Sequence, residues 1–381
     1  RRVPMRPLTV VQLLPALEGG GVERSTLEIA DALVRAGHRA RVVSAGGRLV
    51  PRLEALGAEH IPLPIGRKSP WVLRHVPALH RVLAGADIVH VRSRLPAWMA
   101  QFALRGLPDA QRPVLVSTVH GLNSPSRYSR VMTRGERVIC VSDTVKAHVL
   151  RHYPATDAAR LVVIPRGIDP ADFPEAPRPD RAARARVAAQ HPRLGGDGPL
   201  LLLPGRGTRL KGHADALTLL ARLRADGVQA VLWMPGAREP GREAYIAELE
   251  AEAARAGIAD AVVITAATDA IAEAYAASDA VLQLSRKPEA FGRTVVEALA
   301  CGRPVVGWAH GGVGELLAEL HPAGAVPAFD TEALVAATRR ALAGEGGPAP
   351  GMRERLSTYS LATMQARTLD LYASLARHLP R

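Results

Sequence analysis

Short apolar segments alternate with longer amphipathic segments along most of the chain. In the first half the apolar segments lie at residues 8–14, 40–44, 59–63, 87–91, 114–119, 137–141 and 161–164, and in the second half at 200–203, 228–233, 261–264, 280–284 and 304–308. Short apolar strands separated by helical stretches are typical of parallel sheets that helices cover on both faces. The pattern therefore predicts an α/β fold with two Rossmann-like, doubly wound parallel sheets.

A proline-rich connection separates the two series of strands. Prolines stand at positions 170, 174, 177 and 179, directly after the last strand of the first series. A chain of 381 residues is also too long for one ordinary core. We therefore predict domains at residues 1–170 and 171–359, followed by an amphipathic helix at about 360–381.

The composition is that of a soluble enzyme, with 48% hydrophobic and 22% charged residues and a net charge of +13. No apolar run approaches the roughly 18 residues of a membrane span, and residues 1–7 do not look like a secretory signal, so we expect a cytoplasmic protein. The two cysteines, Cys140 and Cys301, suggest neither a disulfide framework nor a metal site.

The positive charge is confined to the first half of the chain. Residues 1–170 contain 25 Lys and Arg against 12 Asp and Glu, whereas the remaining residues are balanced. A one-sided basic domain indicates an anionic partner, such as a phospholipid surface, nucleic acid or a phosphorylated acceptor. A general bias towards arginine is the alternative, although it does not explain the asymmetry.

Two glutamates, Glu289 and Glu297, flank the predicted start of a helix. Glu289 follows the strand at 280–284, and residues 291–294 form the first helical turn. The free N–H groups of such a turn attract phosphate oxygens, and Glu297 lies about two turns further along. Taken alone, such a pair is more often two solvated surface charges, and other parts of the chain have to decide.

Two cations, Arg206 and Lys211, lie on a glycine-containing loop after the strand at 200–203. At the same sheet edge as Glu289 they could bind a diphosphate without a metal ion, and no Asp-x-Asp pair is present for Mg²⁺. His120 ends the strand at 114–119, where a catalytic role competes with a structural one.

Three further stretches leave two interpretations open. Gly19–Gly21 follow the first strand but fit neither the dinucleotide nor the P-loop fingerprint, so a tight turn is an alternative to a ligand loop. The stretch 310–315 is either part of a donor pocket or an ordinary turn before a helix. Residues 67–83 are either a crossover helix or a membrane contact, and Pro77 argues against a regular helix.

Together these features resemble retaining glycosyltransferases of family 4, which have the GT-B fold. The resemblance rests on Glu289…Glu297, on the loop Gly205-Arg206…Lys211-Gly212 and on the Gly-Gly-Gly-Val-Glu-Arg loop at 19–24, and it runs over essentially the whole chain. The sequence around these motifs is most similar to that of bacterial lipopolysaccharide-core enzymes. Residue 166 is Arg, whereas Asn is usual at the corresponding position of the family. We interpret the segment at 163–169, which contains it, as structural.

The resemblance implies a role for each motif. Two Rossmann-like domains would face a central cleft, the first binding the acceptor and the second the donor, and the terminal helix would cross back to the first domain. Glu289 would hold the transferred sugar, His120 would lie beside sugar and acceptor, and Glu297 would bind the ribose. The donor diphosphate would contact Arg206, Lys211, Gly20, Gly21 and the N–H groups of Phe291, Gly292, Arg293 and Thr294.

The resemblance also implies the substrates and partners. The donor would be a nucleotide sugar, either a UDP-hexose or GDP-mannose, and no metal or other cofactor is expected. The acceptor would be a glycolipid or a phosphorylated saccharide of cell-envelope biosynthesis, reached by peripheral binding to the anionic inner membrane. A nucleotide-sugar epimerase is one alternative. A nucleic-acid-binding protein is another, although no nucleic-acid-binding motif is visible.

Overall fold

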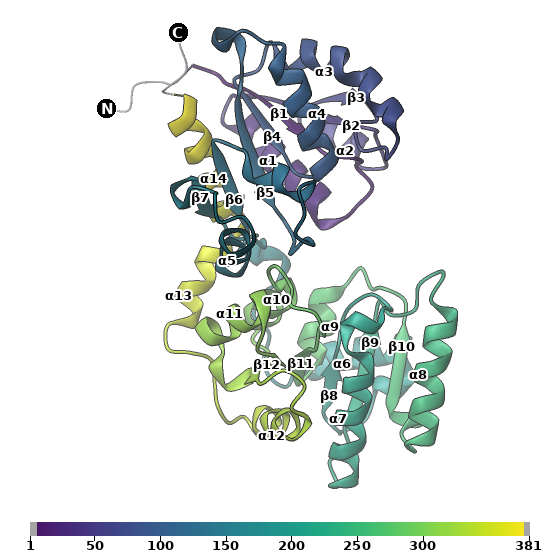
Figure 1. The fold of residues 1–381 in the computed structure, drawn as a ribbon. Coiled ribbons are helices and arrows are strands. Elements are labelled where there is room, and N and C mark those ends of the chain that lie inside the picture. The colour runs from purple at the N-terminus through teal and green to yellow at the C-terminus, as the bar shows by residue number, and fades with distance from the viewer. Residues whose placement is uncertain (1–5, 377–381) are drawn as a thin grey trace. The chain divides into compact units, whose positions relative to one another are not determined.

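The chain divides into two compact units, which Figure 1 shows in a computed structural model that describes residues 6–376. The N-terminal unit consists of Arg1–Gly167 together with Leu361–Arg381, and the C-terminal unit is Ile168–Ser360. The domain boundaries expected from the sequence, after residues 170 and 359, lie within a few positions of this division. Each unit is described by itself below.

The N-terminal unit is built on a seven-stranded parallel sheet with the strand order β3-β2-β1-β4-β5-β6-β7. Its strands are β1 Thr9–Leu13, β2 Arg39–Ser44, β3 Glu59–Pro62, β4 Ile88–Val91, β5 Val114–Val119, β6 Arg137–Cys140 and β7 Leu161–Val163. The central strands are buried along their length, as β4 illustrates. A strand covered on both faces needs a continuous apolar run, which is why these segments stand out in the sequence.

The described residues of this unit form six α-helices: α1 Gly21–Arg35, α2 Val50–Ala55, α3 Val76–Leu83, α4 Arg94–Arg105, α5 Asp143–His152 and α14 Leu361–Ala376. The C-terminal helix α14 packs on α1, where the side-chain amide of Gln365 donates to the carbonyl of Glu28 at 2.7 Å. The stretch at 67–83 is not one helix: a 3₁₀ helix, η1 Pro70–His75, precedes α3. Pro77 therefore lies in the first turn of α3, where its missing N–H costs nothing.

The C-terminal unit contains a six-stranded parallel sheet with the order β10-β9-β8-β11-β12-β13. Its strands are β8 Leu200–Leu202, β9 Val231–Pro235, β10 Val262–Thr265, β11 Ala280–Gln283, β12 Val305–Trp308 and β13 Ala325–Val326. Its helices are α6 Arg181–Gln190, α7 His213–Ala225, α8 Glu243–Arg255, α9 Ile271–Ala277, α10 Arg293–Ala300, α11 Gly311–Leu320, α12 Thr331–Leu342 and α13 Met352–Leu356. The sequence analysis missed β13, which is only two residues long.

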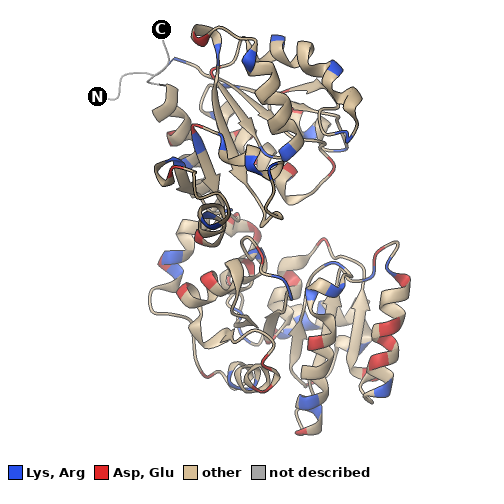
Figure 2. Cartoon of the chain, in the orientation of Figure 1, with Lys and Arg blue, Asp and Glu red and all other residues tan. Residues whose placement is uncertain are grey.

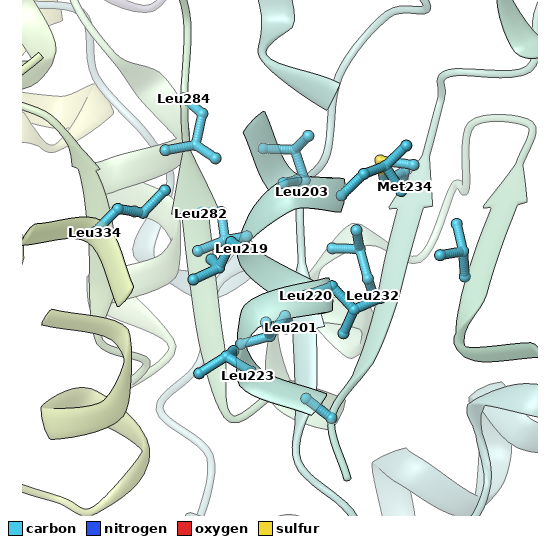
Figure 3. Close-up of a cluster of buried hydrophobic side chains, with 14 of the residues drawn as sticks. Leu201, Leu203, Leu219, Leu220, Leu223, Leu232, Met234, Leu282, Leu284 and Leu334 are labelled. Carbon is cyan, nitrogen blue, oxygen red and sulfur yellow. The ribbon is translucent and has the colours of Figure 1, made fainter. Parts of the chain in front are cut away.

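The core of the C-terminal unit is made largely of leucines from α7 and from the strands beneath it. Figure 3 shows Leu219, Leu220 and Leu223 of α7 beside Leu201 and Leu232 of the sheet, all fully buried. Burying a leucine side chain contributes about 1.5–3 kcal/mol. The rigid sheet that results fixes the loops at the carboxyl ends of its strands.

The first and last residues of the C-terminal unit lie next to each other. Ile168 forms a parallel β-bridge with Ser360, and its N–H donates to the carbonyl of Tyr359 at 2.9 Å. The segment that follows Ile168 is held by Arg303, which is 1% exposed. Its guanidinium donates to five carbonyl groups, those of Ala176, Pro177, Ala276, Ser278 and Cys301.

Both sheets reverse their strand order at one point, between β1 and β4 in the first and between β8 and β11 in the second. In doubly wound sheets, ligands bind outside the carboxyl ends of the strands at such a point. The loops that follow these four strands are therefore the first place to look for a functional site. They contain Gly20 and Arg92 in the N-terminal unit, and Lys211 and Glu289 in the C-terminal unit.

Basic and acidic residues occur on both units, and acidic residues lie along α8 of the C-terminal unit (Figure 2). None of the helices within residues 6–376 combines the length and the apolar character that a membrane span requires.

Candidate active site

Glu289 and Lys211 meet at the switch point of the C-terminal sheet. The ammonium group of Lys211 lies 2.7 Å from Oε1 of Glu289, and the hydroxyl of Ser285 donates to the same oxygen at 2.5 Å. Nε2 of Gln283 donates to Oε2 at 3.3 Å. Burial alone would raise the pKa of Glu289, but Lys211 and these donors lower it below its ordinary value. Glu289 is therefore held as a carboxylate.

Helix α10 begins directly beside this ion pair. Its N-cap is Gly292, whose φ of 115° disfavours any residue with a side chain. A Cβ at this position would also lie 3.0 Å from Val313 of α11. The glycine thus turns the chain sharply from the Glu289 loop into the helix. The N–H groups of the first turn, which include those of Arg293 and Thr294, have no acceptors within the helix and can bind an anion.

The stretch at 310–315, for which the sequence left two interpretations, packs against the Glu289 loop. Gly311 begins α11 with a φ of 57°, and a Cβ there would lie 2.8 Å from the backbone N of Glu289. The N–H of Gly312 donates to the carbonyl of Glu289 at 2.7 Å, and Nε2 of His310 donates to the carbonyl of Ser285 at the same distance. These contacts fix the backbone that carries Glu289.

Glu297 lies inside α10, almost buried at 9% exposure. The hydroxyl of Tyr275 donates to its Oε2 at 2.8 Å, and Nε of Arg293 lies 2.5 Å from its Oε1. Burial, together with the nearby charge of Glu297, raises the pKa of Tyr275 well above its ordinary value, so the phenol remains a donor. Each carboxylate oxygen has one protein partner and can accept a second hydrogen bond.

Arg206 pairs with a carboxylate other than Glu289. Its side chain is 70% exposed, and its Nε lies 3.3 Å from Glu239, whereas Lys211 contacts Glu289. The sequence analysis placed both cations on one diphosphate site. The structure brings Lys211 into the Glu289 group and pairs Arg206 with a different carboxylate.

In the N-terminal unit, His120 lies between two arginines. Nη1 of Arg92 is 3.4 Å from Nε2 of the ring, and Nη2 of Arg166 is 3.1 Å from Nδ1. Burial and the two guanidinium charges lower the pKa of His120 well below its ordinary value. Arg92 is itself held by Gln12, whose side-chain oxygen accepts from Nε at 2.9 Å and from Nη2 at 2.7 Å.

The glycine loop after β1 is occupied by a side chain of its own helix. The N–H groups of Gly19 and Gly20 both donate to Oε2 of Glu23, the first at 2.8 Å. The Glu23 carboxylate thus takes up the N–H groups of Gly19 and Gly20, and the contact of donor phosphate with Gly20 and Gly21 stays a prediction. His90 lies between Thr118 and Tyr372, with Nε2 2.6 Å from the threonine hydroxyl.

Tyr275, Arg92 and Ser285 are among the residues at these sites that the sequence analysis missed. Tyr275 holds Glu297 from the neighbouring helix α9, and no spacing in the sequence connects the two. Arg92 and Ser285 do carry a weak signal, because each is a polar residue directly after a buried strand at the switch point. Such positions face the edge at which ligands bind.

Two family descriptions match the chain: "Glycosyltransferase Family 4" over residues 19–172 and "Glycosyl transferases group 1" over residues 188–362. A D-inositol 3-phosphate glycosyltransferase of Xylanimonas cellulosilytica is 29% identical over 408 aligned positions, which cover 95% of this chain and 94% of the relative. The crystal structure of a glycosyltransferase from Rickettsia africae superposes with a TM-score of 0.85 at 26% identity, and the match covers 98% of this chain and all of that one.

The chain is a glycosyltransferase with the GT-B fold. The predicted fold class, the predicted enzyme class and the resemblance to this group are thereby confirmed. Another protein of the same fold, Alr3699/HepE from Anabaena, was solved in complex with UDP and glucose. The Anabaena structure superposes on this chain with a TM-score of 0.77 at 19% identity, and the match covers 96% of this chain and all of the Anabaena chain.

All three groups of candidate residues lie inside the matched segments. The cluster around His120 belongs to the segment at 19–172, and the Glu289 and Glu297 groups belong to the segment at 188–362. Within residues 6–376 there is no group of three or more His, Cys, Asp and Glu side chains that could hold a metal ion.

Proposed function

We propose that this glycosyltransferase moves a hexosyl group from a nucleotide sugar to a phosphorylated acceptor, with retention of the anomeric configuration and without a metal ion. The observation that carries this proposal is the pairing of Lys211 with Glu289 at the switch point, beside the amino end of α10. A cation and free N–H groups at one sheet edge suit a diphosphate leaving group. The complex of Alr3699/HepE with UDP and glucose supports a donor of this class.

Each side chain of the C-terminal site has a distinct task in this proposal. Lys211 and the first turn of α10 bind the diphosphate, and Glu297, which Tyr275 orients, accepts hydrogen bonds from the ribose. Glu289 already accepts three hydrogen bonds, and a carboxylate has about four acceptor positions, so roughly one is left for a sugar hydroxyl. This environment favours a role in holding the sugar. Arg206 can reach the diphosphate only by leaving Glu239.

The acceptor we propose carries phosphate, and it is either a phosphorylated saccharide or a lipopolysaccharide-type glycolipid. The excess positive charge of residues 1–170 supports an anionic acceptor, because those residues form most of the N-terminal unit. The name of the Xylanimonas relative gives inositol 3-phosphate as its substrate. That molecule is therefore the first acceptor to test.

The donor can be identified with a thermal-shift panel of UDP-, GDP- and ADP-sugars, because a ligand that binds the folded state raises the melting temperature. We expect one nucleotide to stabilise the wild-type chain and to lose that effect in Glu297→Ala. The matched control is Glu332→Ala, which removes an exposed glutamate that is paired with Arg222 in the same unit. Unchanged donor binding in Glu297→Ala would contradict the assignment of the site.

Transfer is then measured with the selected donor and with inositol 3-phosphate or a lipopolysaccharide precursor, and the anomeric configuration of the product is read by NMR. An epimerised donor sugar, formed in the absence of acceptor, would point to an epimerase. An inverted product would overturn the retaining assignment.

We further propose that the N-terminal unit binds an anionic membrane surface peripherally. Large apolar side chains are exposed on this unit, with Trp71 at 77%, Leu73 at 50% and Tyr128 at 42%. One of them has an arginine beside it: the guanidinium of Arg94 lies over the ring of Tyr128, with its Cζ 5.4 Å from the ring centroid. Co-sedimentation should show binding to vesicles that contain anionic phospholipid and not to purely zwitterionic ones. Equal binding to both would remove the electrostatic argument.

A further inference from the structure

Phe329 has a backbone conformation that a bulky residue rarely adopts. Its φ is 69°, and within residues 6–376 no other residue except glycine has a positive φ. The N–H of Asp330 donates to the carbonyl of Pro327 at 3.1 Å, so Phe329 is the third residue of a four-residue turn. Turns with a positive φ at this position favour glycine or asparagine, because larger side chains are strained there. Strain of this kind often accompanies a functional role of the residue.

The ring of Phe329 is held by its neighbours but is not buried. The guanidinium of Arg286 lies over it, with Cζ 4.4 Å from the ring centroid. Arg286 is fixed in turn by Asp215, whose two carboxylate oxygens lie 2.8 and 2.6 Å from Nη1. The rings of Trp308 and His310 each contact the phenyl ring edge to face, with centroids 5.8 Å apart. Phe329 nevertheless remains 48% exposed, so packing alone does not account for the strained ring.

The ring lies at the sheet edge that carries Glu289. Phe329 follows β13, His310 follows β12 and Arg286 follows β11, and these three strands are neighbours in the sheet. Nε2 of His310 donates to the carbonyl of Ser285, and the hydroxyl of Ser285 donates to Glu289. A chain of three contacts thus connects the exposed ring with the carboxylate of the candidate active site.

We propose that Phe329 binds a sugar ring of the substrate, which packs on the exposed part of the phenyl ring. A hexose presents C–H groups on the faces of its ring, and these pack on an electron-rich aromatic face, whereas its hydroxyl groups bind polar side chains such as Glu289. The inference rests on the proposed function, because that function supplies the sugar. Two rings share the required chemistry: the hexosyl group of the donor, and the saccharide or inositol ring of the acceptor.

Phe329→Leu removes the flat ring and keeps an apolar side chain in the same strained conformation. Calorimetry on the full chain compares this variant with the wild type, using the nucleotide sugar that the thermal-shift panel selects and the corresponding nucleoside diphosphate. The transfer assay gives the KM of the acceptor. An aromatic contact changes affinity roughly threefold to tenfold, so Phe329→Leu should weaken the binding of the nucleotide sugar or of the acceptor by this factor.

The pattern of the loss identifies the sugar. Weaker binding of the nucleotide sugar, with unchanged binding of the nucleoside diphosphate, assigns Phe329 to the transferred hexosyl group. A raised KM of the acceptor, with unchanged donor binding, assigns it to the acceptor. Phe329→Tyr keeps the ring and should behave as the wild-type chain does. The inference is overturned if Phe329→Leu binds both substrates normally, or if it loses affinity for the nucleoside diphosphate to the same extent, because the ring would then contact the nucleoside.

Phe329→Gly tests the strain. Glycine adopts this φ without steric cost, so the variant should melt at the same temperature as the wild type or higher, while it binds the affected substrate at least as weakly as Phe329→Leu does. Ala328→Gly is the matched control, because it loosens the same turn and keeps the ring. A lower melting temperature of Phe329→Gly together with normal substrate binding would assign the ring to packing. Equal weakening in Ala328→Gly would assign the effect to the turn. Either result overturns the inference.

The wild-type chain separates this inference from the function on which it rests. If the wild type neither binds a nucleotide sugar nor transfers a sugar, the proposed function fails and the inference fails with it. If the wild type transfers sugar and Phe329→Leu does so with the same constants, only the inference about Phe329 is wrong.

Discussion

Replacing Tyr275 by Phe tests whether Glu297 binds the donor. The tyrosine is 1% exposed, and its hydroxyl donates to Oε2 of Glu297 at 2.8 Å. Phe has the same ring and fills the same space, so the substitution removes one oxygen without opening a larger cavity. The carboxylate then retains Arg293 as its partner and loses the donor that fixes its orientation.

A hydrogen bond to a charged group contributes about 1.5–3 kcal/mol. Because Arg293 still neutralises Glu297, we take the lower end, about 1.5 kcal/mol, for the cost of orienting the carboxylate in the variant. Each 1.4 kcal/mol corresponds to about a tenfold change in affinity. If the ribose binds to Glu297, Tyr275→Phe should therefore raise the Kd of the nucleotide sugar about tenfold.

Titration calorimetry with the donor chosen by the thermal-shift panel measures this effect. Tyr245→Phe is the control, because its hydroxyl lies 3.3 Å from Nδ1 of His213, in the same unit and outside the Glu297 group. We expect that variant to bind the donor as the wild-type chain does. The reasoning is refuted if Tyr275→Phe folds and its Kd is within about twofold of the wild-type value.

Three further predictions concern pH and metal. Since Lys211 and the neighbouring donors hold the pKa of Glu289 below its ordinary value in the folded chain, the stabilisation from this pair should be complete above the ordinary pKa of a glutamate. It should be lost as the pH falls through the depressed pKa. The difference in melting temperature between wild type and Glu289→Gln should accordingly be constant from pH 6 to 8 and shrink in acid, and a difference unchanged at pH 3 would argue against this. Because burial and its two arginine neighbours lower the pKa of His120, NMR should show its imidazole neutral between pH 6 and 8, whereas a titration midpoint near 6.5 would contradict the geometry. Transfer should persist in EDTA, and activity that is lost there and restored by Mg²⁺ would show that a metal is required.

The strands could be predicted from the sequence because burial on both faces leaves a local signature. Ile88–Val91 is buried at every position, and its apolar run is visible without any knowledge of its neighbours. Ala325–Val326 has no such signature, because two residues are too few to form a pattern. The grouping of Glu289 with Lys211 was likewise predictable, since both follow strands at the same edge of the sheet.

The remaining contacts of the candidate site join residues that are far apart in the sequence, so the spacing of residues within a motif does not reveal them. Tyr275 reaches Glu297 from a different helix, 22 positions away, and Arg206 pairs with Glu239 across 33 positions. Long side chains on loops can choose among several partners, so the sequence could not distinguish these pairings. Position 166 is the clearest case: we interpreted it as structural, and its guanidinium lies beside His120.

The pairing of Ile168 with Ser360 has a consequence for protein engineering. A segment whose two ends are adjacent can be exchanged as a cassette, because both junctions keep their spacing whatever lies between them. Residues 168–360 of a relative could thus be grafted between Gly167 and Leu361. The sugar nucleotide that such a chimera uses would report which half of the molecule selects it.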